Sequence, residues 1–310
     1  MSAGPTFFGD VLADRVQQRG TCAMVGLDPQ PELLPEGLAR AHGVDPERPY
    51  QEPQKLVAAY RAFLLGVIEV VHELVPAVKV QSAFFEELGP EGMALQGEVI
   101  EAASQAGLLV VLDAKRGDIG STARAYARAA LDPHGPWRAD AVTVSAYLGP
   151  DTLEPYLPYV RRHGRGVFVL VRTSNRRAEL LQEAPLAAGG CVAELVAGWV
   201  EELAVGTVGD CELGGVGAVV AATAPVMLRR MRELMPHAWF LVPGYGAQGG
   251  TAQDVAAAWR PDGLGALVNS SRGILRGARV AEAQGKAWQQ GVRDATVAMT
   301  EALSEAWRRS

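Results

Sequence analysis

The chain has 310 residues, 48% hydrophobic and 21% charged, which is typical of a folded globular protein and argues against intrinsic disorder. The formal net charge is −6 and no basic run is longer than a pair, so we expect no nucleic-acid partner. The apolar segments are too short to cross about 30 Å of hydrocarbon and no signal-peptide pattern is present, so we expect a cytoplasmic protein with no membrane partner.

Short β-rich runs alternate with longer segments of helical periodicity along the chain. Residues 7–20 predict an N-terminal helix that ends at Gly20, and residues 280–308 predict closing helices. Most of the β-rich runs are continuously apolar, as expected for parallel strands that are covered on both faces. The predicted strands are residues 22–27, 77–81, 108–112, 141–144, 167–171, 218–222, 239–242 and 266–268.

Eight strand–helix units in about 250 residues match the size of one (β/α)8 barrel. A doubly wound sheet would more often have about five to seven strands and a Gly-rich turn after the first. We therefore predict an α/β fold, a single TIM-barrel domain over residues 1–310 with an N-terminal helix and a C-terminal helical extension. Long spacings between successive strand ends predict insertions near residues 29–56 and 176–215.

Charged side chains occur where the predicted strands end, which is where such barrels have their active sites. Asp113 and Lys115 are two residues apart, so an extended strand places both on one face, and Lys79 on the neighbouring strand can join them. A structural ion pair would explain one Asp–Lys pair, but three converging charges favour a functional site. Nearby carboxylates keep such lysines protonated, so we expect a proton donor rather than a Schiff-base nucleophile.

Glycine accounts for 35 of the 310 residues, and one dense group follows the seventh predicted strand. Residues 244–250 contain four glycines around Gln248, and Arg272 follows the eighth strand. A flexible turn would account for one or two of these glycines. The whole set favours a phosphate site formed by backbone N–H groups, which barrels commonly have at this place.

The sequence predicts neither a metal ion nor a cofactor. The three cysteines have no C-x-x-C spacing, and neither a dinucleotide-binding fingerprint nor a P-loop is present. The histidines fall in predicted helices and loops away from the strand ends, which disfavours a catalytic triad or a His-ligated metal. They are His42, His72, His134, His163 and His237.

Four segments carry a resemblance to a known family. They are residues 78–86 (VKVQSAFFE), 113–122 (DAKRGDIGST), 244–250 (GYGAQGG) and 269–275 (NSSRGIL). In this order, and across nearly the whole chain, they resemble the orotidine 5′-phosphate decarboxylase family in its longer bacterial form, the type 2 subfamily. The D-x-K-x-x-D-I pattern within the second segment is highly specific.

The resemblance implies decarboxylation of orotidine 5′-phosphate to UMP in de novo pyrimidine biosynthesis, without a cofactor, by a homodimer with shared active sites. Lys79, Asp113, Lys115 and Asp118 would form the family's charged tetrad, and Asp118 and Thr122 would reach into the partner's site. Asp113 would crowd the substrate carboxylate. Lys115 would stabilise the carbanion that forms as CO₂ leaves and then protonate C6.

The resemblance also assigns the groups that bind the rest of the substrate. Asp28 and Lys79 would hold the ribose hydroxyls, and Ser174 the pyrimidine amide. Gln248 and Arg272 would hold the phosphate, and this remote binding energy would assist the reaction.

Two positions depart from the family pattern, since Ala146 and Arg176 stand where proline is expected. Two alternatives stay open, another barrel enzyme of the superfamily acting on a sugar phosphate, or a nucleotide-binding barrel without catalysis. A metal-dependent relative would need further acidic ligands, and an aldolase would need an isolated, neutral lysine. A binding protein would have no need of all four tetrad charges.

Overall fold

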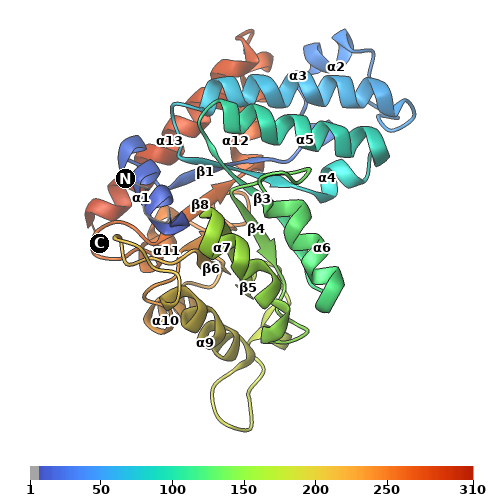
Figure 1. The fold of residues 1–310 in the computed structure, drawn as a ribbon. Coiled ribbons are helices and arrows are strands. Elements are labelled where there is room, and N and C mark those ends of the chain that lie inside the picture. The colour runs from blue at the N-terminus through green and yellow to red at the C-terminus, as the bar shows by residue number, and fades with distance from the viewer. Residues whose placement is uncertain (1–6, 310) are drawn as a thin grey trace, which may run out of the picture.

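The computed structural model describes residues 7–309, and these residues form a closed barrel of eight parallel strands in chain order (Figure 1). This confirms the predicted (β/α)8 fold. The strands are β1 (Ala23–Leu27), β2 (Ala77–Gln81), β3 (Leu109–Arg116), β4 (Ala141–Val144), β5 (Gly166–Arg172), β6 (Val216–Val220), β7 (Phe240–Val242) and β8 (Ala266–Ser270).

All eight predicted strands are present, and their bounds differ by a few residues. The largest difference is at β3, which we expected to end at residue 112 but which continues to Arg116. The apolar run ends at Leu112, whereas backbone pairing with β2 and β4 continues through the polar residues that follow. β6 lies two residues earlier than predicted, because the apolar run continues past the strand into the buried Ala221 and Ala222.

Helices surround the barrel and cover the outer face of the strands (Figure 1). The predicted N-terminal helix is confirmed as α1, and Gly20 ends it in the left-handed conformation, with φ +64°. The α-helices are α1 (Phe8–Arg19), α2 (Glu36–Ala41), α3 (Pro53–Val71), α4 (Ala83–Glu86), α5 (Gly89–Gln105), α6 (Gly120–Leu131), α7 (Leu157–His163), α8 (Glu179–Gln182), α9 (Val192–Val205), α10 (Pro225–Leu234), α11 (Ala252–Val255), α12 (Arg272–Ala283) and α13 (Trp288–Arg309).

Two helices close the fold, and the first begins earlier than predicted, at Arg272 rather than near residue 280. α12 and α13 pack tightly because glycines face each other where the helices cross. A Cβ added to Gly291 would lie 1.9 Å from the carbonyl oxygen of Gly277, so larger residues cannot occupy this crossing. The C-terminal helix is thereby held against the helix that starts at Arg272.

The two segments predicted as insertions have different structures. Of the predicted 29–56, residues 53–56 already belong to α3 and the rest contains α2. The carboxylate of Glu282 in α12 accepts hydrogen bonds from the N–H groups of Glu36 and Gly37 at the start of α2 (2.5 and 2.7 Å). Residues 176–215 contain the short α8, an extended loop and α9, and α9 packs on β5 and β6 as one of the barrel helices (Figure 1). Residues 1–6 and 310 of the predicted domain lie outside the described residues.

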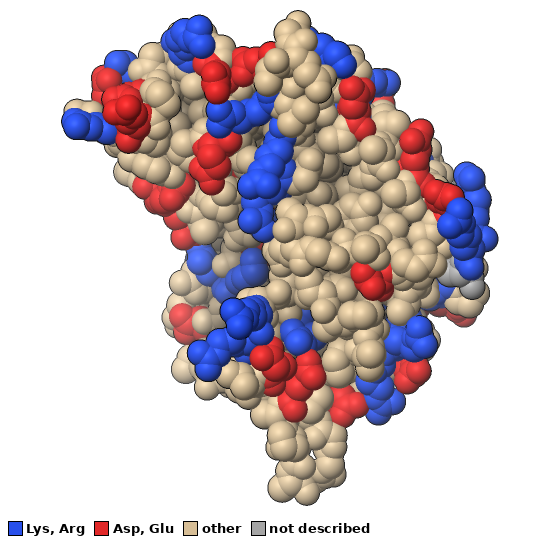
Figure 2. Space-filling view, turned by 180° about the vertical axis from the view of Figure 1, so that it is seen from behind, with Lys and Arg blue, Asp and Glu red and all other residues tan. Residues whose placement is uncertain are grey.

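The face of the molecule in Figure 2 has acidic and basic side chains interspersed around a broad area without charged residues. Basic side chains form a column left of the centre of this face, and acidic side chains lie beside it (Figure 2). Among the helices of residues 7–309, none combines the length and the apolar character that a membrane crossing requires.

Close backbone packing inside the barrel predicts a sharp effect of one methyl group. A Cβ at Gly217 in β6 would lie 2.3 Å from the carbonyl oxygen of Trp239 and 3.0 Å from the ring of Phe168. We expect Gly217→Ala to lower the free energy of unfolding in urea by about 1–3 kcal/mol. The control is Gly198→Ala in α9, where the added Cβ meets no atom within 4 Å. It should raise stability by about 0.5–1 kcal/mol, and equal effects of the two substitutions would contradict this account.

Candidate active site

The carboxyl ends of the strands surround a cavity of about 200 Å³. Seven of the nine residues predicted from the sequence as catalytic or substrate-binding line it, namely Asp28, Lys79, Asp113, Lys115, Ser174, Gln248 and Arg272. A second cavity, of about 260 Å³ and mostly apolar, lies beside α1 and α13 and contains none of these residues. The predicted chemistry therefore converges on the first cavity alone.

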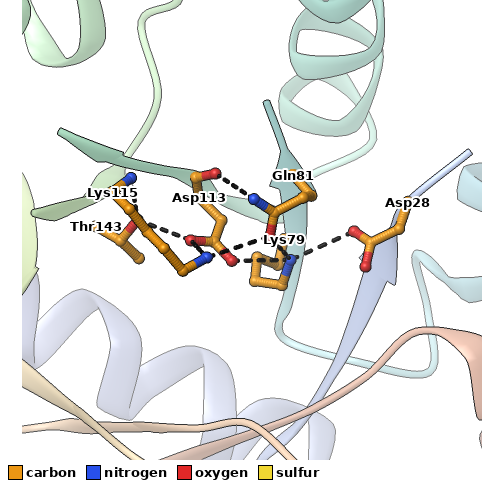
Figure 3. Close-up of polar contacts among 6 residues, drawn as sticks. All are labelled: Asp28, Lys79, Gln81, Asp113, Lys115 and Thr143. Atoms are coloured by element: carbon orange, nitrogen blue, oxygen red, sulfur yellow. Dashed lines mark hydrogen bonds and ion pairs between the residues drawn. The ribbon is translucent and has the colours of Figure 1, made fainter. Parts of the chain in front are cut away.

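Lysines and aspartates alternate along the floor of this cavity (Figure 3). The Nζ atom of Lys79 lies 3.3 Å from Asp28 Oδ1 and 3.1 Å from Asp113 Oδ2, and Lys115 Nζ lies 2.7 Å from Asp113 Oδ1. The side chains of Lys79 and Asp113 are 5% and 8% exposed, whereas that of Lys115 is 44% exposed. Lys79 is thus a buried member of the network, and Lys115 carries its positive charge to the open side.

The pairing of these charges shifts their pKa values. Burial alone would raise the pKa of Asp113, but the charges of Lys79 and Lys115 and their hydrogen bonds outweigh it and lower this pKa to about 2. Burial alone would lower the pKa of Lys79, but the carboxylates of Asp28 and Asp113 outweigh it, so the pKa lies above its ordinary value. The network therefore keeps Asp113 ionised and Lys79 protonated at neutral pH.

The backbone at Lys115 differs from the regular strand on which the prediction relied. Lys115 has φ +48°, a left-handed conformation that is unfavourable for a residue with a side chain, and the pairing of β3 with β4 shifts register between Leu112 and Arg116. The hydroxyl of Thr143 in β4 accepts the Lys115 N–H (2.9 Å) and donates to Asp113 Oδ1 (2.8 Å). The side chains of Asp113 and Lys115 do meet, but because of the left-handed backbone and the register shift, and not because of the regular alternation of a strand.

Gln81 also belongs to the network, although no role was predicted for it from the sequence. Its Nε2 donates to the backbone oxygen of Asp113 (3.0 Å), and its Oε1 accepts from both Lys79 and Lys115 at 3.4 Å. The signal was present in the sequence, because Gln81 follows Lys79 by two residues on the same strand and so shares its face. The role of Thr143 was not predicted either, because it is the one polar residue within the apolar strand β4.

The opposite rim of the cavity is formed by the glycine-rich loop after β7. Gly244, Gly246 and Gly249 have φ values of +92°, +69° and +93°, which explains why glycine occupies these positions. Gln248 is exposed on this loop, and Arg272 is exposed as the first residue of α12, whose N-terminus carries the positive end of the helix dipole. This rim can bind an anion such as a phosphate.

Asp118 and Thr122 do not line the cavity of their own chain. Asp118 is half-buried after β3, where its Oδ1 accepts the N–H of Ile119 (2.8 Å), and Thr122 is exposed on α6. Exposed apolar side chains lie in the same loop and in the loop after β4, with Ile119 59% and Tyr147 77% exposed. The structure therefore does not bring these two residues together with the other seven within one chain.

None of the five histidines lines the cavity. Within residues 7–309, no group of three or more His, Cys, Asp or Glu side chains is arranged to hold a metal ion.

The fold and the cavity define an enzyme of the (β/α)8-barrel class, with a lysine–aspartate network and a glycine-rich loop at the carboxyl ends of its strands. The family model described as "Orotidine 5'-phosphate decarboxylase / HUMPS family" matches residues 24–287. The orotidine 5′-phosphate decarboxylase of Rhodopirellula baltica is 46% identical over 96% of this chain and 98% of its own length. The Leishmania donovani OMP decarboxylase structure is 34% identical, with a TM-score of 0.75, and covers 98% of this chain and 100% of its own.

This chain therefore belongs to the orotidine 5′-phosphate decarboxylase family. The family resemblance inferred from the four sequence segments is confirmed. Its assignment to the type 2 subfamily stays a prediction.

The low pKa of Asp113 predicts a pH-dependent contribution to stability. Because this pKa falls from an ordinary 3.8 to about 2 on folding, the ionised carboxylate stabilises the native state above about pH 4, and this is lost as pH falls towards 2. The contribution is about 2 kcal/mol. The difference in free energy of unfolding between wild type and Asp113→Asn, measured in urea, should shrink by this amount between about pH 5 and pH 2. A difference that stays constant over this range would contradict the assignment.

Proposed function

We propose that Lys115 protonates C6, and that no metal or cofactor takes part, in the reaction of this family, the decarboxylation of orotidine 5′-phosphate to UMP in pyrimidine biosynthesis. The observation that carries the mechanism is the position of Lys115, whose ammonium lies 2.7 Å from the buried Asp113 carboxylate and opens onto the cavity. This arrangement supports a proton donor that is oriented next to a fixed negative charge.

Substrate binding in this proposal uses the two sides of the cavity. Gln248 and Arg272 hold the phosphate on the rim formed by the β7 loop and α12, and Ser174 in the loop after β5 holds the pyrimidine amide. Asp28, which directly follows β1, and Lys79 on β2 hold the ribose hydroxyls, and Lys79 Nζ lies 3.3 Å from Asp28 Oδ1. The reacting carbon then lies over Asp113 and Lys115, remote from the phosphate that anchors the substrate.

The chemical step needs only the charges already present. The Asp113 carboxylate destabilises the nearby substrate carboxylate, and this repulsion ends when neutral CO₂ leaves. The C6–carboxylate bond breaks with its electron pair left on C6, where the Lys115 ammonium stabilises the negative charge. At about 4 Å and an effective dielectric near 20 this attraction is roughly 4 kcal/mol. A Lys115 N–H proton then passes to C6, and the neutral amine regains a proton from water.

The ion pairs made by Lys79 and Lys115 weigh against another barrel enzyme acting on a sugar phosphate, whether an aldolase or a metal-dependent decarboxylase. An aldolase needs a neutral lysine, whereas Asp113 contacts both Lys79 and Lys115. A metal-dependent decarboxylase needs further acidic ligands, and the carboxylates in the cavity, Asp28 and Asp113, are both bound to Lys79. A binding protein without catalysis would not require Lys115 beside Asp113.

The proposal includes a homodimer with shared sites. Asp118 and Thr122 lie outside the cavity of their own chain, and the apolar side chains of Ile119, Tyr147 and Leu148 are exposed in the loops after β3 and β4. A second copy covering this surface would bury those side chains and bring its own Asp118 and Thr122 to the cavity. A location in the cytoplasm remains a prediction from the sequence.

The first test is loss of orotidine 5′-phosphate absorbance after EDTA treatment of the purified protein. We expect full turnover without added metal. Lys115→Ala should lower kcat by more than about 10⁴-fold, because it removes both the proton donor and the charge that stabilises the carbanion, and it should still bind UMP.

The matched control is Lys286→Ala, an exposed lysine between α12 and α13 that should keep wild-type activity. Turnover only with added metal, or activity that survives in Lys115→Ala, would overturn the mechanism.

The shared site is tested by subunit exchange. Asp118→Ala and Lys115→Ala should each be inactive alone. A mixed dimer has one site with wild-type Lys115 from one subunit and wild-type Asp118 from its partner, so equal mixing should restore about a quarter of the wild-type activity. Exchange demonstrated by mass spectrometry with no recovered activity would exclude the shared site.

A further inference from the structure

The end of β5, which leads directly to Ser174, is held by a charged side chain in an unusual place. Arg172 is the last residue of β5 and is only 8% exposed. Its Nε donates to Glu183 Oε1 (2.8 Å) and one terminal nitrogen donates to the backbone oxygen of Thr173 (2.6 Å). A buried guanidinium is unfavourable without such partners, so Glu183 is required to keep Arg172 in this position.

The next residue, Thr173, is held just as closely by Gln182. The Thr173 N–H donates to Gln182 Oε1 (2.9 Å), and Gln182 Nε2 donates to the Thr173 hydroxyl (2.9 Å), which in turn donates to Asn175 Oδ1 (2.6 Å). The last pair between β5 and β6 joins Arg172 to Val220. After this last pair, the Thr173 N–H has no backbone partner in β6, and the side-chain amide of Gln182 accepts its hydrogen bond instead.

Gln182 and Glu183 follow one another at the end of α8, in the segment between β5 and the barrel helix α9. Neither residue lines the cavity, whereas Thr173 and Ser174 both do. Residues 173–183 contain no proline, so no fixed φ angle stiffens this loop, and Arg176 is exposed. The restraint on the loop therefore comes from side-chain contacts made by α8.

We propose that Gln182 and Glu183 are positioning residues that fix Ser174 for the pyrimidine base and so set the base affinity of the site. The inference rests on the proposed function, which assigns the pyrimidine amide to Ser174. Gly244 of the phosphate-side loop lies against the other side of Ser174, since a Cβ added to Gly244 would be 3.5 Å from Ser174 Cβ. Ser174 thus directly follows Thr173, which α8 holds, and also lies close to Gly244 of the glycine-rich loop.

Two ligands that share a phosphate but differ in the base separate this role from a general structural one. Calorimetric titration should show that Gln182→Ala weakens UMP binding about tenfold, the effect of losing about one good hydrogen bond to the base. Binding of ribose 5-phosphate, which has no base, should change less than about twofold. In the decarboxylation assay the same variant should raise KM more than it lowers kcat.

The matched control is Glu179→Ala, an exposed residue of the same short helix, which should leave both affinities unchanged. If Gln182 acts through Ser174, Ser174→Ala and the double variant Ser174→Ala/Gln182→Ala should bind UMP with the same affinity. Equal weakening of both ligands, no weakening of either, or additive losses in the double variant would overturn the inference. Failure of the wild-type protein to decarboxylate orotidine 5′-phosphate would instead overturn the proposed function, and the two failures are therefore distinguishable.

Discussion

The contact on which the rest of the site depends is the buried ion pair between Lys79 and Asp113. Neither charge could remain ionised alone at this depth, because removing an ion from water costs several kcal/mol unless a counter-charge replaces the solvent. Asp28 and Lys115 extend the pair at either end, so each charge has an opposite neighbour. The alternation has a chemical result, since a carboxylate is kept charged within reach of a ligand while a lysine beside it remains a cation.

The barrel supplies the spacing that this chain of charges needs. Register places Lys79 beside Gly26 of β1 and Gln81 beside Asp113 of β3. Gly26 has no side chain because a Cβ there would lie 2.6 Å from Ser271 Cβ, and this close approach brings the β8 loop to the edge of the cavity. The hydrogen-bonded ladder thus fixes the charged groups through the backbone, and flexible lysine side chains have little freedom left to lose when a ligand binds.

The sequence was sufficient for those features that depend on a regular period. Continuous apolar runs predicted all eight strands, and neighbouring strand ends predicted the meeting of Lys79 with Asp113. It was insufficient where an irregular backbone decides the outcome. The left-handed Lys115 depends on a register shift between β3 and β4, and the contact of Gln182 with Thr173 depends on how a loop returns to the strand it has left. Neither the conformation of Lys115 nor the contact of Gln182 produces a periodic pattern in the sequence. Asp118 marks a third limit, because the shared site proposed for it would lie between two copies, and Asp118 does not line the cavity of its own chain.

Position 115 is subject to two opposed requirements. Its left-handed backbone conformation has the lowest energy for glycine, whereas the proposed reaction needs a long cationic side chain at this position. The residue that is best for the fold is therefore not the residue that is best for the reaction, and selection for stability alone would remove the lysine. Under the proposed mechanism this strain is offset by the effect of Lys115 on rate, and the Thr143 hydroxyl, which accepts the Lys115 N–H and donates to Asp113, stabilises the unfavourable conformation.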